Sequence, residues 1–328
     1  MTIHFQTPQW LTASKDAADA LRFLARNEDL KQALMTDARF EPIAKRVSQR
    51  FVAGETIDDA LRKAAAINLQ GHAATIDYMG ESCRDRDFAN HETSEFLKLI
   101  AQIGIRQINA SISLDISHIG SLIDEQLGFD NLLRITRDAQ AIGQEVMISM
   151  EGSERTDATL SMYRKISAAM GDHAASVGIT IQARVLRTDV DLTEIMKLPG
   201  RIRLVKGAYD EPKSIAFDYE ASETTQRYVD FAKQLLLTKH QCSIATSDET
   251  IQDELHDFIA ANSLAGAPFE FEILMGLGSD RLETLRARGY PTREYVVFGQ
   301  EWFLYVCNRI ADRPHRALTA IADAIARP

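Results

Sequence analysis

The sequence predicts a (β/α)8 barrel preceded by a helical segment. After Gly71, eight short segments of strand character alternate with amphipathic segments that are long enough to be crossover helices. These repeats fill about 250 residues, which is the usual length of such a barrel. A doubly wound sheet is the main alternative, and periodicity alone does not exclude it. Because no strand candidate is followed by GxGxxG, the barrel is favoured over a dinucleotide-binding sheet.

The first part of the chain, residues 1–70, is expected to be a helical segment. Between Thr12 and Gln70, apolar residues recur at spacings of three and four, which is typical of amphipathic helices. Gly54 is a helix stop, and Thr56, followed by two aspartates, is a helix N-cap. We therefore expect about three helices before the first strand.

The strand candidates lie in the remaining residues, 71–328. They are residues 73–80, 107–114, 145–150, 177–185, 202–209, 241–246, 269–276 and 293–299. In a (β/α)8 barrel the chemistry takes place at the C-terminal ends of the strands, where the βα loops form one face. Polar residues at these ends are therefore the first candidates for a functional site.

Charge and cysteine content narrow the class of protein. A net charge of -10 counts against a nucleic-acid-binding protein, which needs a basic face. The 3 cysteines are far apart and form no CxxC motif, so we expect reduced thiols rather than a disulfide framework or a zinc knuckle. None of the 8 histidines falls at a strand end, so no metal site is expected.

The sequence carries no signal for secretion or membrane insertion. The stretch MTIHFQTPQW lacks the basic region and the apolar region of a signal peptide. No apolar run reaches the roughly 18 residues that a spanning helix needs. We expect a cytoplasmic protein, and peripheral contact with the inner face of the membrane stays open.

One strand carries the most informative residues, in the stretch RIRLVKGAYDEP at positions 201–212. Arg203 lies within an apolar strand and needs an anion, a carbonyl or a polar ligand edge, because a buried unpaired cation is very costly. Lys206 and Gly207 offer an ammonium group and an unobstructed backbone, which suit a phosphate or a flavin. The alternative is that Lys206 reaches solvent and Gly207 makes a turn.

This stretch, together with QARVLRT, MEGSERTDATL, DYMGE and the ending REYVVFG…W…Y…R, resembles the proline dehydrogenase family from about Asp77 to Pro314. The resemblance implies a flavin-dependent (β/α)8 barrel, also found as the first catalytic unit of bifunctional proline-utilisation proteins. It implies non-covalent FAD, hydride transfer from the carbon next to the ring nitrogen, and reoxidation by a quinone or similar acceptor. Residues 71–328 would be this catalytic barrel, with a C-terminal helix that contacts the substrate.

The resemblance also assigns roles to individual residues. The implied flavin contacts are Met150, Gln182, Arg203, Lys206, Gly207, Ala208, Thr246 and Ser247. The implied substrate contacts are Asp115, Arg184, Tyr295, Tyr305, Asn308 and Arg309. Arg203, Ser149 and Asp115 fall at the catalytic positions, and a donor such as Arg203 near the flavin N5 stabilises charge gained on reduction. Tyr295 and Tyr305 have a plainer alternative as core aromatics.

Several positions depart from the family pattern. Two departures concern cations: Asn308 stands where the family has the first of two adjacent arginines, and Asp115 stands where it has a lysine on the second strand. In the other departures, Ser149 replaces an aspartate, Arg184 replaces a tyrosine, Ser247 replaces a histidine, Val297 replaces a proline and Glu272 replaces a glutamine. The lysine and the two arginines hold the substrate carboxylate in the family. Asp115 would repel a carboxylate by several kcal/mol at an effective dielectric constant near 20 and a separation of roughly 4 Å.

The sum of the charge changes also makes the pocket less favourable for a carboxylate. Asp115 changes the charge by minus two and Asn308 by minus one, whereas Ser149 and Arg184 each add one. The pocket is therefore about one unit more negative than the family pattern. Either Asp115 pairs with Arg184 while Arg309 alone holds a displaced carboxylate, or the substrate has no carboxylate there and Asp115 accepts hydrogen bonds from it.

The second explanation is favoured, so the sequence predicts an FAD-dependent dehydrogenase or oxidase of an amine, such as a proline derivative, rather than of L-proline. Two alternatives stay open: a catalytically inactive binding or regulatory protein, and a proline dehydrogenase with a rearranged carboxylate site. An unrelated metal-dependent barrel is disfavoured by the positions of the histidines.

Overall fold

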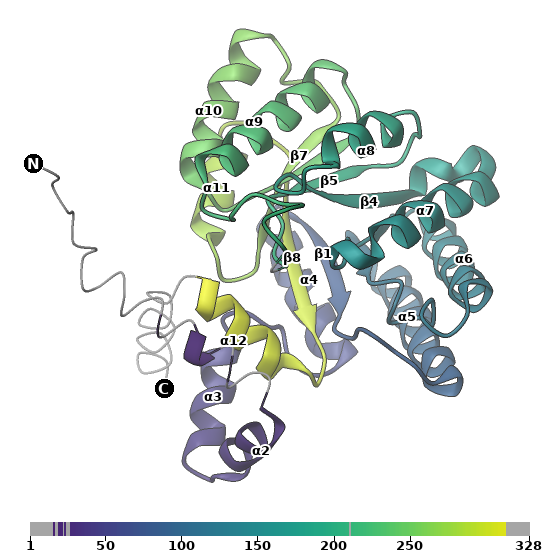
Figure 1. Cartoon of the computed structure of the whole chain (residues 1–328), viewed down its shortest axis with the longest axis vertical. Coiled ribbons are helices and arrows are strands. Elements are labelled where there is room, and N and C mark those ends of the chain that lie inside the picture. Colours follow the sequence, from purple (N-terminus) through teal and green to yellow (C-terminus); the bar gives the residue numbers. More distant parts are fainter. Residues whose placement is uncertain (1–15, 17–18, 22, 24–26, 210, 313–328) are drawn as a thin grey trace, which may run out of the picture.

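The computed structural model describes residues 27–209 and 211–312, together with residues 16, 19–21 and 23. Most of the first helix expected from the sequence, and the residues after 312, lie outside this part of the chain. Within it, strands and helices alternate from residue 73 to residue 312 (Figure 1). The structure therefore describes residues 71–312 of the predicted barrel region, 71–328, apart from residue 210.

Eight parallel strands form a closed barrel in the order β1 to β8. They are β1 (Ala73–Tyr78), β2 (Ala110–Leu114), β3 (Val146–Ile148), β4 (Val177–Gln182), β5 (Ile202–Val205), β6 (Cys242–Ala245), β7 (Phe269–Leu274) and β8 (Thr292–Phe298). The barrel is closed by β1 and β8, whose register runs from Ala73 opposite Arg293 to Tyr78 opposite Phe298. The predicted (β/α)8 fold is confirmed, and the doubly wound sheet is excluded.

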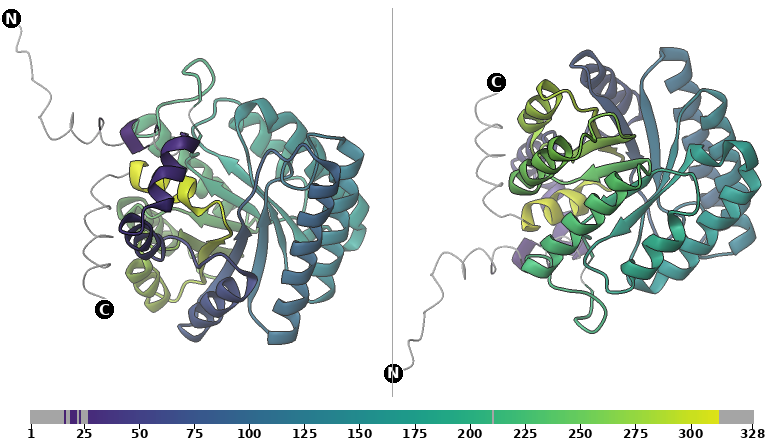
Figure 2. Two further views of the ribbon diagram at one scale, coloured as in Figure 1. Left: turned by 90° about the horizontal axis from the view of Figure 1, so that it is seen from below. Right: turned by 90° about the horizontal axis from the view of Figure 1, so that it is seen from above.

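Helices surround the barrel on its outside (Figure 2). They are α4 (Ile57–Leu69), α5 (Arg86–Arg106), α6 (Glu125–Ala141), α7 (Thr156–Met170), α8 (Thr188–Ile195), α9 (Ser222–Leu237), α10 (Glu249–Ala261) and α11 (Ser279–Ala287), with the short 3-10 helices η1 (Ser153–Arg155) and η2 (Gly171–Ser176). The predicted N-cap is confirmed, because Thr56 and Asp59 form a capping box at the start of α4.

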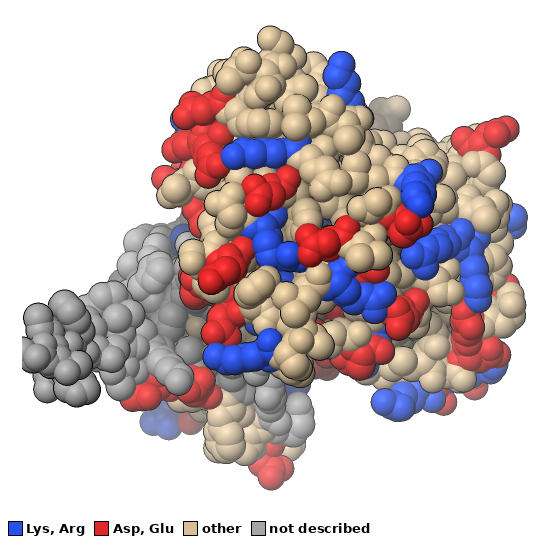
Figure 3. Space-filling view, turned by 45° about the horizontal axis from the view of Figure 1, so that its top comes forward, with Lys and Arg blue, Asp and Glu red and all other residues tan. Residues whose placement is uncertain are grey.

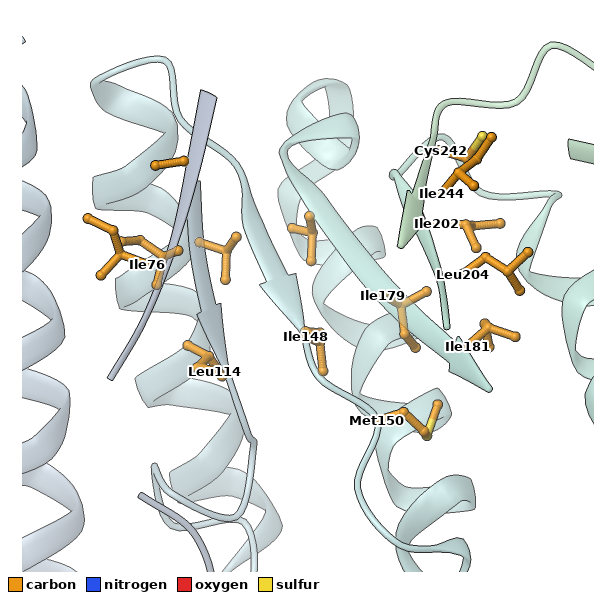
Figure 4. Packing of buried hydrophobic residues seen from close by; sticks show 14 of the residues in the cluster. Ile76, Leu114, Ile148, Met150, Ile179, Ile181, Ile202, Leu204, Cys242 and Ile244 are labelled. Atoms are coloured by element: carbon orange, nitrogen blue, oxygen red, sulfur yellow. The ribbon is translucent and has the colours of Figure 1, made fainter. Parts of the chain in front are cut away.

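Successive side chains of a strand face opposite sides, and this alternation separates buried apolar side chains from buried polar side chains. Ile76, Ile148 and Ile179 belong to the main apolar core, part of which is drawn in Figure 4. Polar residues at other positions of the strands interact across the inside of the barrel. Arg293 on β8, for example, donates a hydrogen bond to Ser111 on β2, 3.0 Å away. The helices are therefore held by an apolar layer, whereas the barrel interior is polar.

The N-terminal segment packs against the end of the barrel. Its helices α2 (Glu28–Thr36) and α3 (Phe40–Ser48) share a second hydrophobic cluster with the last helix, α12 (Trp302–Asp312) (Figure 1). Two backbone hydrogen bonds fix the strand-like residues after α3: Ala53 donates to Val297, 2.9 Å away, and Gly299 donates to Gly54, 3.0 Å away. The segment is therefore joined to both β8 and α12.

The surface carries charges of both signs. On the face shown in Figure 3, lysine and arginine side chains alternate with aspartate and glutamate side chains. In the part of the chain that the structure describes, no helix combines the length and the apolar character needed to cross a membrane.

Candidate active site

Arg203 is the centre of a polar group inside the C-terminal half of the barrel. Its guanidinium donates hydrogen bonds to Thr180 on β4, at 3.0 Å, and to Ser113 at the end of β2, at 3.0 Å. It also donates to Ser149, which follows β3, at 3.3 Å. Glu272 on β7 lies 3.7 Å from Nη1 and balances the charge. The expectation that this buried cation needs polar partners is confirmed, and the partners lie on β2, β4 and β7 and directly after β3.

Tyr295 and Asp77 lie next to this arginine. The Arg203 guanidinium carbon is 4.8 Å from the centre of the Tyr295 ring, within the range of a cation–π contact. The Tyr295 hydroxyl donates to Asp77 at the end of β1 and lies 3.2 Å from the Ser113 hydroxyl. Burial raises the pKa of Asp77, while the Tyr295 hydrogen bond and the positive charges of Arg203 and His118 act in the opposite direction.

Gln182 and Gly207 lie side by side at the ends of β4 and β5. The Gln182 amide donates to the carbonyl of Glu151, 3.1 Å away, but its buried Oε1 has no hydrogen-bond partner among the described residues. Gly207 has φ of +112°, and a Cβ added there would lie 2.7 Å from that Oε1. A side chain at position 207 would therefore collide with Gln182, and the positive φ also favours glycine.

Lys206 holds the loops after β5 and β6 together. Its ammonium group donates to Thr225 at the start of α9, 3.0 Å away, and pairs with Asp248 at 3.4 Å. The Asp248 amide in turn donates to the Thr246 hydroxyl, 3.1 Å away. Lys206 is mostly buried, so its alternative role as a lysine that merely reaches solvent is not supported.

The other implied flavin contacts differ in exposure. Met150 is buried after β3, Ser247 is half-buried after β6, and Ala208 is exposed after β5. All three follow strand ends on the same face of the barrel as Lys206. Their contact with a flavin stays a prediction.

Asp115 follows β2 and is half-buried among other acids. Its pKa is raised well above the ordinary value, first by burial and then by the negative charges of Glu151, Asp77 and Glu81. Ser149 opposes this through a hydrogen bond. Among the described residues, no lysine, arginine or histidine lies within 4.0 Å of its carboxylate.

Arg184 does not form the ion pair with Asp115 that one explanation required. Its Nε donates to the Phe217 carbonyl at 2.8 Å and its Nη1 to the Tyr209 carbonyl at 2.6 Å. The chain after β4 runs antiparallel to the loop before α9 (Val185 bridges Ala216), so these carbonyls face the guanidinium. The less favoured of the two explanations is therefore not supported, and Arg184 holds the chain that follows Gly207 through the Tyr209 carbonyl.

The last helix carries the remaining predicted substrate contacts. Arg309 lies over the ring of Tyr305, with 5.5 Å between the guanidinium carbon and the ring centre, so the two side chains share one face of α12. Asn308 and Arg309 are both half-buried. Tyr305 and Tyr295 both pack against the second hydrophobic cluster, which joins α12 to β8.

Sequence reasoning missed two parts of this site. Tyr209, the last residue of RLVKGAY, has its pKa raised by burial and by the charges of Asp115, Glu81 and Glu151, so it borders the acidic residues. Arg155 at the start of α7 pairs with the buried Glu151. The position of Tyr209 directly after the Lys-Gly-Ala sequence could have indicated it, whereas Arg155 has no comparable signal.

Comparisons with known proteins agree with this geometry. The family model described as proline dehydrogenase matches residues 60–302. Proline dehydrogenase 1 of Bacillus subtilis is 34% identical over 270 residues, which are 82% of this chain and 88% of that protein. Proline dehydrogenase of Deinococcus radiodurans is 32% identical over 274 residues, covering 83% and 87% of the two chains.

A solved structure supports the fold. Proline utilization A of Bdellovibrio bacteriovorus, inactivated by N-propargylglycine, superposes with a TM-score of 0.77 at 20% identity. The match covers 93% of this chain but only 37% of that longer protein. Fold and site together define a flavin-dependent oxidoreductase that acts on CH–NH groups. More narrowly, the chain belongs to the proline dehydrogenase family.

Proposed function

We propose that this protein uses FAD to oxidise a C–N bond of an amine, and that the amine is a proline derivative or a related compound rather than free L-proline. The observation that carries the proposal is the position of Asp115. Within the described part of the chain, no lysine, arginine or histidine lies within 4.0 Å of this carboxyl group, and the charges of Glu151, Asp77 and Glu81 act on it. Such a site favours the neutral or hydrogen-donating end of a substrate over a carboxylate.

The residues present fit a flavin. Gln182 Oε1 and Arg203 Nη1 are buried without hydrogen-bond partners among the described residues, so the pocket offers one acceptor and one donor to a planar polar ring. Gly207 leaves room for the ring edge, and Lys206 lies beside it as a cation for a phosphate. Met150, Ala208, Thr246 and Ser247 would complete the site. When bound, FAD supplies the acceptor for two electrons.

The residues of the chain have distinct tasks in this reaction. Arg203 is held in place by Thr180, Ser113 and Ser149, so its charge is ready to stabilise negative charge beside it without moving. Tyr295 is fixed by its hydrogen bond to Asp77 and forms one wall of the pocket. Arg309 and Tyr305 on α12 would contact the far side of the substrate.

A second candidate is oxidation of L-proline itself. The raised pKa of Asp115 favours it, because a protonated carboxyl group donates a hydrogen bond and does not repel a carboxylate. Relatives named proline dehydrogenase also favour it. In this case Arg309 and neutral Asp115 would replace the cations of the family.

Anaerobic mixing separates the two candidates. L-prolinamide has a neutral, hydrogen-donating amide in place of the carboxylate of L-proline, so comparing the rates at which the two compounds bleach the flavin tests the effect of Asp115. We expect faster bleaching by L-prolinamide or by pyrrolidine. Rapid bleaching by L-proline at low millimolar concentration establishes the second candidate instead. A colourless protein that releases no FAD on denaturation would show that the chain is an inactive binding protein.

The electron acceptor and the location in the cell belong to the same proposal. We expect electrons to leave through a quinone or a similar acceptor, and a cytoplasmic protein that contacts the inner face of the membrane to reach it. Reoxidation of the reduced protein by quinone-containing vesicles, compared with oxygen alone, tests this expectation.

A further inference from the structure

Arg203 shares its buried position with a single carboxylate. Oε1 of Glu272 lies 3.7 Å from Nη1 of Arg203, and no other carboxylate of the described residues lies within 4.0 Å of this guanidinium. Arg203 is on β5 and Glu272 on β7, so the contact spans the intervening strand β6. The two residues are 5% and 2% exposed. Water and salt therefore screen their charges much less than they would at the surface.

The contact between Arg203 and Glu272 is electrostatic and is not a hydrogen bond. A separation of 3.7 Å exceeds the range of a hydrogen bond, and Nη1 of Arg203 has no hydrogen-bond partner among the described residues. The other two guanidinium nitrogens are bonded to hydroxyl groups of the barrel. Glu272 is fixed by Thr75, whose hydroxyl donates to Oε1 at 3.0 Å. The carboxylate is therefore held near the cation, while Nη1 stays available as a donor to a ligand.

The contacts of Arg203 favour the ionised form of Glu272. A guanidinium stays charged in proteins, so a neutral Glu272 would leave a buried cation without a nearby anion, which is costly. Burial raises the pKa of Glu272, and Arg203 opposes this more strongly than any other neighbour. Glu270 raises the pKa further, whereas Arg293 and the hydrogen bond from Thr75 lower it. Glu272 is therefore a carboxylate on the alkaline side of a pKa that lies above its ordinary value of 4.5.

We propose that Glu272 lowers the reduction potential of the bound flavin, because its negative charge offsets the positive charge of Arg203. The inference rests on the proposed function, in which Nη1 of Arg203 donates to the flavin. Reduction places negative charge beside this guanidinium, and a net cation favours that change more than a neutral ion pair does. A lower potential makes the reduced protein a stronger electron donor. Glu272 would thus adjust the balance between taking electrons from the amine and passing them to the acceptor.

A reductive titration with a reference dye tests the proposal without any substrate. It measures the midpoint potential of the full-length, FAD-loaded protein and of Glu272→Gln, which keeps the shape of the side chain and removes its charge. We expect the equilibrium constant for two-electron reduction to increase about tenfold in Glu272→Gln, which is a midpoint potential about 30 mV higher. Glu272→Asp keeps the charge and should stay closer to the unchanged protein. An unchanged or lower potential in Glu272→Gln overturns the proposal.

The dependence of this difference on pH separates charge from shape. The charged and titratable side chains that face the pair are Arg203, Glu270, Arg293, Asp77 and Tyr295. Because Glu272 is charged only above its raised pKa, the difference in potential between the unchanged protein and Glu272→Gln should be full on the alkaline side. It should shrink as the pH falls through that pKa. A difference that grows towards acid pH would show that the substitution acts through something other than the charge, and it overturns the proposal.

Glu270→Gln is the matched control. Glu270 lies on the same strand and is also buried, but it forms its ion pairs with Arg201 and Arg293 instead of Arg203. Its loss removes an equal charge from the barrel interior and should change the midpoint potential clearly less than Glu272→Gln does. Equal changes in the two variants would mean that the flavin responds to the total charge of the barrel, and the specific role of Glu272 would be refuted.

Two further outcomes keep this test separate from that of the proposed function. If Glu272→Gln does not bind FAD, Glu272→Met takes its place, since it is also neutral and leaves Thr75 its contact with the Ser111 hydroxyl at 3.1 Å. If the unchanged protein stays colourless with added FAD, the proposed function and this inference fail together. A flavin-loaded protein whose potential is the same with and without the Glu272 charge overturns this inference alone.

Discussion

At the scale of single residues, the substrate proposal depends on Asp115. The resemblance to the family implies a lysine at this position, and the carboxyl group of Asp115 lies instead among the acids Glu151, Asp77 and Glu81. Its electrostatic effect depends on its protonation: ionised, it repels a carboxylate, and neutral, it donates a hydrogen bond. A substitution at this one position therefore tests the substrate proposal directly.

We expect Asp115→Lys to increase the rate of flavin reduction by L-proline about tenfold or more, because a cation replaces an acid beside the carboxylate. The rate with L-prolinamide should fall. Stopped-flow bleaching measures both. Asp115→Asn is the matched control, which removes the acid without adding a cation and should lie between the two. Equal rates in all three proteins would show that Asp115 does not face the substrate.

Arg203 has a structural role beside its role in the pocket. Arg203→Leu should destabilise the protein by about 3–5 kcal/mol, because the buried Glu272 loses its ion-pair partner at 3.7 Å. Urea unfolding measures the loss. The double variant Arg203→Leu/Glu272→Leu removes both charges and should recover most of it. No recovery in the double variant would mean that the polar contacts of Arg203, rather than its charge, stabilise the barrel.

At the scale of elements, the loop after β5 carries two of the proposed flavin contacts, Lys206 and Gly207. Arg184 holds the carbonyls of Tyr209 and Phe217, and thereby the loop that contains Lys206 and Gly207. Arg184→Ala should weaken FAD binding about tenfold, because two charge-assisted hydrogen bonds are lost. Flavin fluorescence measures the dissociation constant. Arg187→Ala, on the neighbouring surface, is the control. Unchanged FAD affinity in Arg184→Ala would mean that the loop is held by other contacts.

The second hydrophobic cluster should control α12 separately from the barrel. Phe51→Ala should cost about 3–5 kcal/mol and speed hydrogen exchange in α12. Phe96→Ala, at an equally buried position of the main core, should cost about as much without a selective effect on α12. Hydrogen exchange measured by mass spectrometry compares the two. Equal exchange of α12 in both variants would contradict the division into two clusters.

At the scale of the whole molecule, ion pairs at the base of the barrel should set its acid stability. Burial works to raise the pKa of Glu270, but Arg293 and Arg201 outweigh it, so the pKa lies below its ordinary value of 4.5. Ionised Glu270 therefore stabilises the fold above that pH, and this contribution is lost as the pH falls through its lowered pKa. Urea unfolding between pH 7 and pH 3 should show a smaller acid-induced loss in Glu270→Gln. An identical loss would exclude Glu270 as its source.

The fold was predictable from the sequence because it depends on local patterns. Strand character, crossover lengths and the N-cap at Thr56 are each visible within a few residues. The partners of Arg203 were not predictable individually, since Thr180 and Ser113 are distant in sequence and meet only when the barrel closes. Arg184 shows most clearly why contacts could not be predicted. Its long side chain can reach several partners, and only the path of the loop before α9 determines which carbonyl group it bonds.

The hydrogen bonds between residues 53–54 and the end of β8 also bear on how the chain folds. Ala53 and Val297 are separated by nearly the whole barrel in sequence, so this contact closes one of the largest loops in the molecule. During synthesis, Phe51 and Val52 leave the ribosome long before the residues that cover them. The barrel can therefore assemble first, and docking of α12 on the N-terminal helices would be a late folding step. Until that step, the apolar side chains of both segments are exposed to chaperones and to aggregation.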